Sequence, residues 1–394
     1  MIRPTVARVD LGAIARNFRS ITEYLAREKG SAGGPLFPGV VAVVKANAYG
    51  HGAGQVARAL EDAGADLLAC ADIEEGSALR AAGVRAAILI FGALSVSDLD
   101  GLFDCALTPT ISTPGAARAV AAAAAKYKQR LPYHLKIDTG MNRLGFRCDN
   151  LRRTLPEVLA CGDLELQAVY THFATADEPD SPLFGEQRRR FTRALAEVDD
   201  IHRGEGRGPL FSADSAGSAA RRPYVHACNS AALLRDARVW YDRVRPGLLL
   251  YGVLPPPLDS TIALEPAMTL VSRVVAVKGI RPGEGVGYGV RFRADAPRTI
   301  AVVPAGYADG LDLRLAGRGA VLVRGRRAPV VGAVSMDMLS ADVTGLDVAP
   351  GDEVVLLGSQ GTDRIDVREM AATIGTIPWE IVCRIGTRIQ RVYT

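Results

Sequence analysis

The feature that most constrains the fold is a repeated alternation of short apolar runs with helix-forming segments between residues 40 and 250. Such alternation is typical of parallel βα units. Eight βα units in roughly 200 to 250 residues fit an α/β TIM barrel, although alternation alone does not exclude an open, doubly wound sheet. The eight predicted strands are Val40–Val44, Asp66–Ala71, Ala86–Phe91, Leu107–Ile111, Tyr133–Ile137, Leu166–Thr171, Val225–Cys228 and Arg243–Arg245.

Helices are predicted between these strands, where good helix formers are concentrated. The clearest are Gly52–Ala65, Asp72–Gly83, Thr113–Arg130 and Glu186–His202. Segments 28–38 and 203–222 are instead rich in Gly, Ser and Arg. That composition predicts surface loops.

The stretch YGVLPPPLDS, residues 251–260, ends the alternation because three consecutive prolines continue neither a helix nor a central strand. We therefore predict a barrel domain over residues 1–250 and a mostly β C-terminal domain over residues 251–394. The strand-forming runs of the second domain are Met268–Ile280, Thr299–Pro304, Ala320–Val323, Ala328–Val334, Leu339–Val343 and Glu353–Leu357.

Composition narrows the class of function. A formal charge of +4 is small for 394 residues, so nucleic acid is not an expected partner. The sequence shows neither a secretory signal nor a run of about 18 apolar residues, so no membrane association is expected and the cytoplasm is the predicted location. The six cysteines have no CxxC spacing and are interpreted as reduced thiols, and no metal site is predicted.

Several polar residues fall at the carboxyl ends of predicted strands, which meet at one mouth in a TIM barrel. Lys45 directly follows the apolar run VVAVV. Its amine is expected to be partly desolvated, which lowers the pKa of a lysine and suits Schiff-base chemistry. At this position alone, an ordinary lysine that extends to water is an equally good interpretation.

Two further strand ends indicate anion binding. Ser230, in CNSAALL, begins a predicted helix whose free N–H groups favour an anion such as phosphate, or it is a plain helix N-cap. Arg245, in RVRPGLLLYG, stays protonated and precedes a turn whose amides suit phosphate. Taken alone, an arginine there is more often an ion-pair partner.

Eight segments, in order along nearly the whole chain, together resemble the signature segments of the alanine racemase family: VVKANAYGHG, LKIDTGMNRLGF, YTHFATAD, CNSAALL, RPGLLLYG, GVGYG, PAGYADG and VGAVSMDM. The resemblance implies an isomerase dependent on pyridoxal 5′-phosphate (PLP), of the third PLP fold type. It implies a homodimer with shared active sites that interconverts L- and D-alanine by a two-base mechanism. In a bacterium the product would supply D-alanine for peptidoglycan.

By this resemblance, Lys45 holds PLP as a Schiff base and is one of two catalytic bases, the other being Tyr288 from the partner subunit. Arg245 faces the pyridine nitrogen, and because a guanidinium keeps its proton, that nitrogen stays unprotonated and electron withdrawal is restrained. The residues implied to bind the cofactor are Lys45, Tyr49, His172, Asn229, Ser230, Arg245, Gly247, Leu248 and Trp379.

The resemblance also implies a substrate pocket. Arg143 would meet the cofactor's phenolic oxygen and the substrate carboxylate, while the partner chain would supply Tyr307, Met336 and Asp337. Lys136 matches a position that is carbamylated in some relatives, and its state here stays open. Trp379 stands where many relatives have a tyrosine, and an indole donates a hydrogen bond but accepts none. Cofactor affinity or the packing around Tyr49 is therefore expected to differ.

Other functions on a similar scaffold remain as alternatives. One is a racemase of broad specificity, or one for serine or lysine. Another is an amino-acid decarboxylase, which Arg245 disfavours because decarboxylases of this architecture place an acidic residue against the pyridine nitrogen. A non-catalytic PLP-binding protein made of the barrel alone is disfavoured by the residues that follow the proline run.

Overall fold

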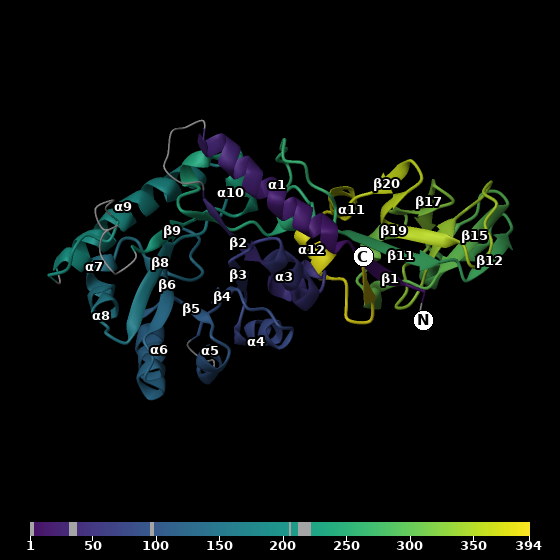
Figure 1. Cartoon of the computed structure of the whole chain (residues 1–394). Helices are drawn as coiled ribbons and strands as arrows, with labels where there is room; N and C mark the ends of the chain where they lie inside the picture. The colour runs from purple at the N-terminus through teal and green to yellow at the C-terminus, as the bar shows by residue number, and fades with distance from the viewer. Residues whose placement is uncertain (1–3, 31–37, 95–97, 205, 212–221) are drawn as a thin grey trace.

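The N-terminal lobe of the molecule is a closed parallel barrel (Figure 1). The computed structural model describes residues 4–30, 38–94, 98–204, 206–211 and 222–394. Each barrel strand pairs with the next along the chain, and β10 pairs with β2 to complete the ring. All eight predicted strands are confirmed, and closure rules out the open sheet. The strands are β2 (Gly39–Val43), β3 (Leu67–Cys70), β4 (Ala87–Ile90), β5 (Thr108–Ile111), β6 (Leu131–Asp138), β8 (Leu164–Tyr170), β9 (Tyr224–His226) and β10 (Arg243–Val244).

Helices lie between the strands, and α3, α4, α6 and α9 confirm the four that were predicted. Local sequence explains α6: Thr113 Oγ1 accepts the Ala116 N–H (3.1 Å), and Pro114 occupies the first turn. The helices of this lobe after the first barrel strand are α2 (Lys45–Tyr49), α3 (Ala53–Asp62), α4 (Ile73–Ala81), α5 (Asp100–Asp104), α6 (Pro114–Tyr127), α7 (Leu151–Thr154), α8 (Pro156–Leu159), α9 (Leu183–Gly204) and α10 (Ser230–Arg235). A short strand, β7 (Phe146–Arg147), extends the sheet beside β6.

A long helix, α1 (Leu11–Gly30), was not among the predicted elements. It runs from the second lobe along the barrel (Figure 1). Its buried residues Ile14, Phe18, Ile21 and Leu25 are spaced three and four apart, which is the pattern of an amphipathic helix. The signal was therefore present in the sequence.

The second lobe is built on a β-sheet, as predicted, but the sheet takes strands from both ends of the chain. The N-terminal strand β1 (Val6–Val9) pairs antiparallel with β11 and parallel with β21. The division at residues 250 and 251 had assigned this strand to the barrel, whereas its hydrogen bonds join it to the other lobe. The path through the sheet is β12 (Ala276–Ile280), β15 (Arg298–Val303), β18 (Leu339–Asp342), β17 (Arg326–Val331), β16 (Ala320–Val323), β19 (Glu353–Gln360), β11 (Met268–Arg273), β1 and β21 (Gln390–Tyr393).

Smaller elements of the second lobe reach toward the barrel. The turn η3 (Leu248–Tyr251) leads out of the barrel, and helices α11 (Val367–Ile374) and α12 (Pro378–Cys383) lie between the two lobes in Figure 1. The α12 helix contacts α2. The remaining elements are β13 (Gly285–Val286), η4 (Tyr288–Val290), β14 (Phe292–Arg293), η5 (Tyr307–Asp309), η6 (Leu313–Leu315) and β20 (Asp363–Ile365).

Two sequence expectations concern segments that the structure describes only in part. Most of the two predicted loops, residues 31–37, 205 and 212–221, lies outside the described residues. Residues 28–30 and 203–204 belong to the ends of α1 and α9 rather than to loops.

In the described part of the chain, no helix combines the length and the apolar character needed to cross a membrane.

Candidate active site

A cavity of about 500 Å³ opens at the carboxyl ends of the barrel strands. This is the face on which barrel enzymes build their active sites. Nine of the predicted site residues line it, together with Lys136, and α12 contributes one wall. These residues are Lys45, Tyr49, Arg143, His172, Asn229, Ser230, Arg245, Gly247 and Trp379.

Lys45 begins a tight turn of unusual backbone geometry. Left-handed backbone costs an L-residue about 1–2 kcal/mol, so neighbouring groups must stabilise such a turn. Glu75 Oε1 accepts the Ala46 N–H (2.7 Å), and Asn47 Oδ1 accepts the Ala53 N–H (2.8 Å). Backbone strain of this kind is concentrated at functional sites. The residues with positive φ are Ala46 (53°), Asn47 (52°), Ala48 (53°) and Tyr49 (51°).

The Lys45 amine lies in an environment that lowers its pKa. Burial is the largest cause, and the Arg143 guanidinium lowers the pKa further. Cys383 and Glu75 act in the opposite direction. A lowered pKa increases the fraction of neutral amine at neutral pH, and the neutral amine is the form that attacks an aldehyde.

Arg245 is only 3% exposed and is held by four acceptors. Its Nη1 donates to His226 Nδ1 (2.8 Å) and its Nη2 to His172 Nδ1 (3.1 Å). The backbone carbonyls of Thr171 and Ala227 accept from Nη2, each at 2.9 Å. Burial lowers the pKa of Arg245 to about 10, so the guanidinium keeps its proton at neutral pH.

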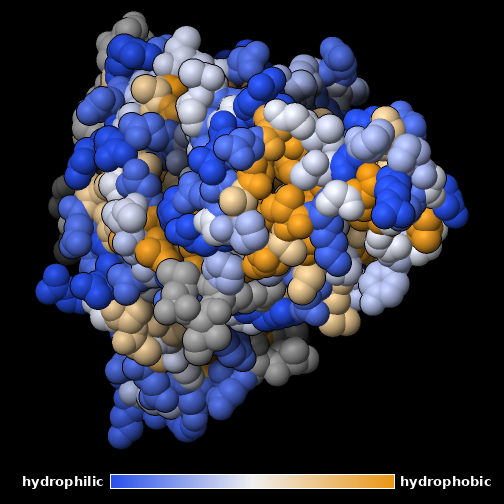
Figure 2. Space-filling model, turned by 90° about the vertical axis from the view of Figure 1, so that its right-hand side faces the viewer, coloured by the Kyte–Doolittle hydropathy of each residue, from blue (hydrophilic) through white to orange (hydrophobic). Residues whose placement is uncertain are grey.

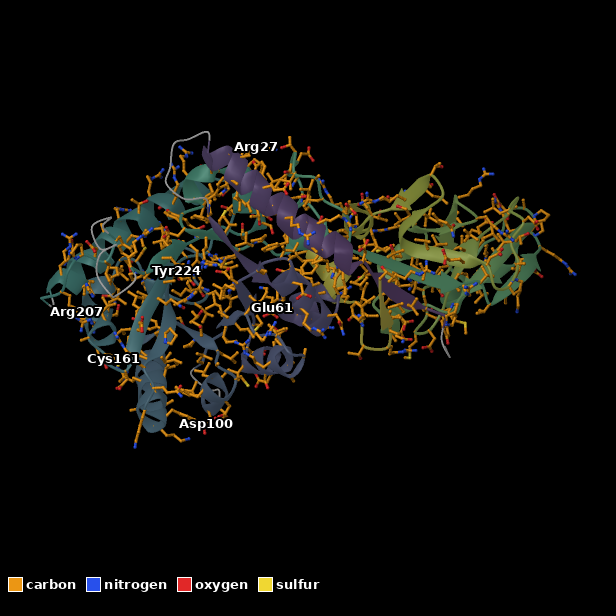
Figure 3. All side chains as sticks on the ribbon, in the orientation of Figure 1. Arg27, Glu61, Asp100, Cys161, Arg207 and Tyr224 are labelled. Atoms are coloured by element: carbon orange, nitrogen blue, oxygen red, sulfur yellow. The ribbon has the colours of Figure 1, made fainter. Side chains whose placement is uncertain are left out.

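A chain of buried hydrogen bonds continues from Arg245 through the barrel. His226 Nε2 lies 3.1 Å from His134 Nδ1, and His134 Nε2 lies 2.7 Å from the hydroxyl of Tyr224, which is labelled in Figure 3. Because arginine only donates hydrogen bonds, Nδ1 of His226 must accept and the His226 proton must lie on Nε2. His226 Nε2–H then donates to Nδ1 of His134, so the His134 proton also lies on Nε2 and is donated to the Tyr224 hydroxyl. Burial lowers the pKa of His134 to about 3, which keeps it neutral. The chain therefore fixes the orientation of Arg245.

Lys136 adds a further cation to the cavity. It is 6% exposed, and its Nζ lies 5.5 Å from the centre of the Tyr170 ring. Burial, followed by the charges of Arg143 and Arg245, lowers the pKa of Lys136 to about 8. Lys45, Lys136, Arg143 and Arg245 thus share one cavity, which is suited to an anionic ligand.

The cavity also offers hydroxyl and amide groups suited to a phosphate. The Gly247 N–H donates to Ser230 Oγ (3.0 Å), and Leu248 follows as the first residue of η3. A Cβ at Gly247 would lie 2.4 Å from the Tyr49 hydroxyl, so only glycine permits this close approach. Burial raises the pKa of Tyr49, which keeps its phenol protonated and able to donate. The chemistry of the cavity therefore fits PLP: the Lys45 amine suits its aldehyde, the Arg245 guanidinium suits its ring nitrogen, and the hydroxyl and amide donors suit its phosphate.

Asn229 has a structural role next to this group. Its side chain caps α10 by accepting the Ala232 N–H (2.9 Å). The N-cap expected at Ser230 is therefore one residue earlier in the chain. The Ser230 hydroxyl is left to face the cavity and Gly247.

Four of the other five predicted site residues, Tyr288, Tyr307, Met336 and Asp337, lie on the surface of the second lobe rather than in the cavity lining of their own chain. The fifth, Leu248, is buried at the start of η3 and does not line the cavity either. Tyr288 is 78% exposed, Tyr307 43% and Met336 53%. Asp337 is exposed and accepts from Arg388 Nη2 (2.7 Å). Figure 2, viewed from the side of the second lobe, shows hydrophobic side chains gathered among hydrophilic ones. Exposed aromatic and methionine side chains are typical of protein contact surfaces.

The cavity also contains residues that the sequence analysis did not assign. Tyr170 ends strand β8, and its hydroxyl lies 3.0 Å from Thr110 Oγ1. Its place two residues before His172, at a strand end, was a usable signal. Cys383 lies four residues after Trp379 on α12 and also lines the cavity. Nothing in the local sequence places α12 beside the barrel. Among the described residues, no group of three or more His, Cys, Asp or Glu side chains is placed to hold a metal ion.

The fold and the site define a class of protein: a parallel barrel joined to a β domain, with a lysine in the cavity at the barrel mouth. The chain matches the family model described as alanine racemase, N-terminal domain, over residues 9–255. It matches that of alanine racemase, C-terminal domain, over residues 267–393. The chain therefore belongs to the alanine racemase family.

Individual relatives agree over the full length of the chain. The alanine racemase of Carboxydothermus hydrogenoformans is 40% identical over 395 residues, covering 100% of both chains. The crystal structure of alanine racemase from Streptomyces lavendulae superposes with a TM-score of 0.89 at 32% identity, covering 100% of this chain and 98% of that one. The crystal structure of alanine racemase from Bartonella henselae, described with covalently bound pyridoxal phosphate, superposes with a TM-score of 0.83 at 27% identity. The match covers 99% of this chain and 99% of that one.

Proposed function

We propose that this protein is a PLP-dependent enzyme that interconverts L- and D-alanine. The observation that carries the proposal is the position of Lys45, whose amine faces a cavity containing a buried and firmly held arginine. Membership of the alanine racemase family over both domains supports it. Arg245 also disfavours the decarboxylase alternative, because a guanidinium stands where an acidic residue would be needed.

Two bases on opposite faces of the substrate would perform the inversion. When held on Lys45, PLP supplies an electron-withdrawing ring that acidifies the Cα–H bond of the amino acid. We assign one face to Lys45 and the other to Tyr288 of the partner subunit. One base removes the proton, and the conjugate acid of the other delivers a proton from the opposite side.

The remaining residues would hold the reactants in place. Arg143 is proposed to bind the substrate carboxylate, since it lines the cavity and carries a permanent positive charge. Tyr49, Ser230 and the amides of Gly247 and Leu248 are proposed to bind the phosphate, with Trp379 at its edge. His172 accepts from Arg245 through Nδ1, so its Nε2–H remains available to donate into the site.

We further propose a homodimer in which each chain completes the partner's site. Tyr307, Met336 and Asp337 would narrow the substrate pocket from the second chain, together with Tyr288. Their exposure on the second lobe supports this arrangement. In a bacterium we propose that the D-alanine supplies peptidoglycan precursors, which the bacterial alanine racemases among the relatives support. Six free cysteines suit a reducing compartment such as the cytoplasm.

The proposal is tested by spectroscopy and a substrate comparison. The purified protein with PLP should show the visible absorbance of a Schiff base and should racemise L-alanine faster than L-serine or L-lysine. Equal rates on all three substrates would favour the broad-specificity alternative. A protein that forms the Schiff base but is inert toward all three would contradict the proposed activity.

The role of Lys45 has its own test. Lys45→Ala should lose the visible absorbance, and racemisation should fall by at least about 10³-fold because the cofactor anchor and one base are both removed. Borohydride reduction followed by peptide mass spectrometry should place the cofactor on Lys45 in the wild type. Lys278→Ala, at an exposed position of the second lobe, is the control and should retain both properties. A fully active Lys45→Ala protein would refute the assignment.

A further inference from the structure

We propose that Glu75 of α4 is a positioning residue that holds the Lys45 turn in its left-handed conformation and supplies a negative charge that acts on the Lys45 amine. The inference rests on the proposed function, because it assigns Glu75 a role toward the cofactor lysine. Glu75 does not line the cavity, so its effect is transmitted through Lys45.

Both carboxylate oxygens of Glu75 are used by the backbone at the ends of neighbouring strands. Oε1 accepts the Ala46 N–H (2.7 Å), just beyond β2, and Oε2 accepts the Ala71 N–H (2.8 Å), just beyond β3. The Glu75 N–H in turn donates to Asp72 Oδ1 (2.8 Å), the N-cap of α4. One side chain therefore joins the turn, the adjacent strand end and the start of a helix.

The Ala46 contact acts directly on the conformation of Lys45. The Ala46 N–H belongs to the peptide group that follows Lys45, so fixing that group fixes rotation about the Lys45 Cα–C bond. Ala46 is also the first of four consecutive residues with positive φ. Because alanine and tyrosine do not favour this region, a hydrogen bond at its first residue helps to decide whether the turn forms.

Glu75 also opposes an excess of positive charge around Lys45. Arg143 and Arg245 lower the pKa of Lys45, and Glu75 is a carboxylate that raises it. Lys136 and His172 also interact electrostatically with Lys45 from the ends of β6 and β8, which do not pair with β2. The titratable and charged groups that face Lys45 are thus Glu75, Lys136, Arg143, His172, Arg245 and Cys383.

Three variants of the full-length chain separate the two effects. Glu75→Gln removes the charge and one acceptor oxygen. Glu75→Asp keeps the charge but shortens the side chain by one methylene. Glu74→Gln is the matched control, because Glu74 is an exposed residue in the same first turn of α4.

Two readouts are measured in addition to racemisation. The first is the affinity of the apoprotein for PLP, and the second is the pH midpoint for acetylation of Lys45 in the apoprotein, followed by peptide mass spectrometry. Glu75→Gln and Glu75→Asp should both bind PLP at least about tenfold more weakly than the wild type, as expected for loss of a charge-assisted hydrogen bond. In Glu75→Gln alone the pH midpoint should also fall, by roughly half a unit.

The results that would refute the role of Glu75 differ from the results that would refute the proposed function. If Glu75→Gln matches Glu74→Gln in both readouts, the inference is wrong. If Glu75→Gln and Glu75→Asp lose affinity equally while the midpoint of Lys45 is unchanged in both, the electrostatic role is refuted. A wild-type protein that forms no Schiff base with PLP would overturn the proposed function instead, and the Lys45 midpoint would still test Glu75.

Discussion

Lys136 illustrates how the barrel imposes an unfavourable environment on a single charged residue. Its pKa of about 8 lies below the value of about 10.4 expected for a lysine in the unfolded chain. Between these values the unfolded state binds more protons than the folded state, so the free energy of unfolding rises with pH across that window. Below about pH 8 the penalty for burying the charge is present in full.

Lys136→Met should therefore stabilise the protein without PLP at pH 7. The expected gain is at most roughly 3 kcal/mol, seen as a higher thermal midpoint that converges on the wild type as the pH rises from about 8 toward 10. Thermal unfolding in carbonate-free buffer measures this, with Lys278→Met as the exposed control. A gain that does not depend on pH would show that burial of the Lys136 charge is not its cause.

Carbamylation of Lys136 can be examined with the same variants. The neutral amine nitrogen would bond to the carbon of CO₂ with release of a proton, and the resulting carboxylate could pair with Arg143. If this occurs, bicarbonate should raise the thermal midpoint of the wild type and leave Lys136→Met unchanged. An identical response of both proteins would argue against the modification.

At the scale of elements, the Lys45 turn and α12 are in close contact. Gly50 has a φ of 78°, and a Cβ there would lie 2.2 Å from the Val382 carbonyl oxygen of α12. The two elements come from opposite ends of the chain. Close backbone contact between them therefore links the shape of the barrel mouth to the second lobe.

Gly50→Ala should weaken PLP binding by at least about tenfold, because the turn or α12 must move to admit the methyl group. Gly64→Ala is a matched control: Gly64 also has a positive φ, of 106°, but a Cβ there meets nothing within 4 Å. The control carries the backbone strain without the clash. Titration of both apoproteins with PLP checks the prediction, and equal losses in the two variants would attribute the effect to strain alone.

At the scale of the whole molecule, the proposed dimer determines whether the active site is complete. The cavity of one chain contains Lys45, whereas Tyr288 is exposed on the second lobe of the same chain. The barrel-only alternative does not apply, because the chain carries both family domains. Sharing of sites between two copies can be tested by mixing inactive variants.

Lys45→Ala and Tyr288→Phe should each be nearly inactive as homodimers, and Tyr288→Phe should keep the cofactor absorbance. In a hybrid dimer, one of the two sites receives a wild-type lysine and a wild-type tyrosine. Random exchange of subunits should then restore about a quarter of the wild-type activity. Hybrid dimers that form but remain inactive would contradict shared sites, and an active monomer would contradict the dimer.

Much of the barrel and of the cavity lining was predictable because the relevant signals are local. Alternation of apolar runs and helix formers identified all eight barrel strands, and polar residues directly after those strands identified Lys45, His172 and Arg245. The carboxyl ends of parallel strands in a barrel meet at one mouth, so a position in the sequence translates directly into a position in the site.

The tertiary structure decided what depends on contacts between distant residues. The pairing of β1 with β11 and β21, the approach of α12 to the Lys45 turn, and the contacts of Glu75 with two strand ends leave no periodic signal in the sequence. The same holds for the proton positions of His226 and His134 and for the lowered pKa of Lys136. These properties arise from burial and from neighbours that only the folded chain brings together, whereas sequence periodicity reports which face of each element is apolar.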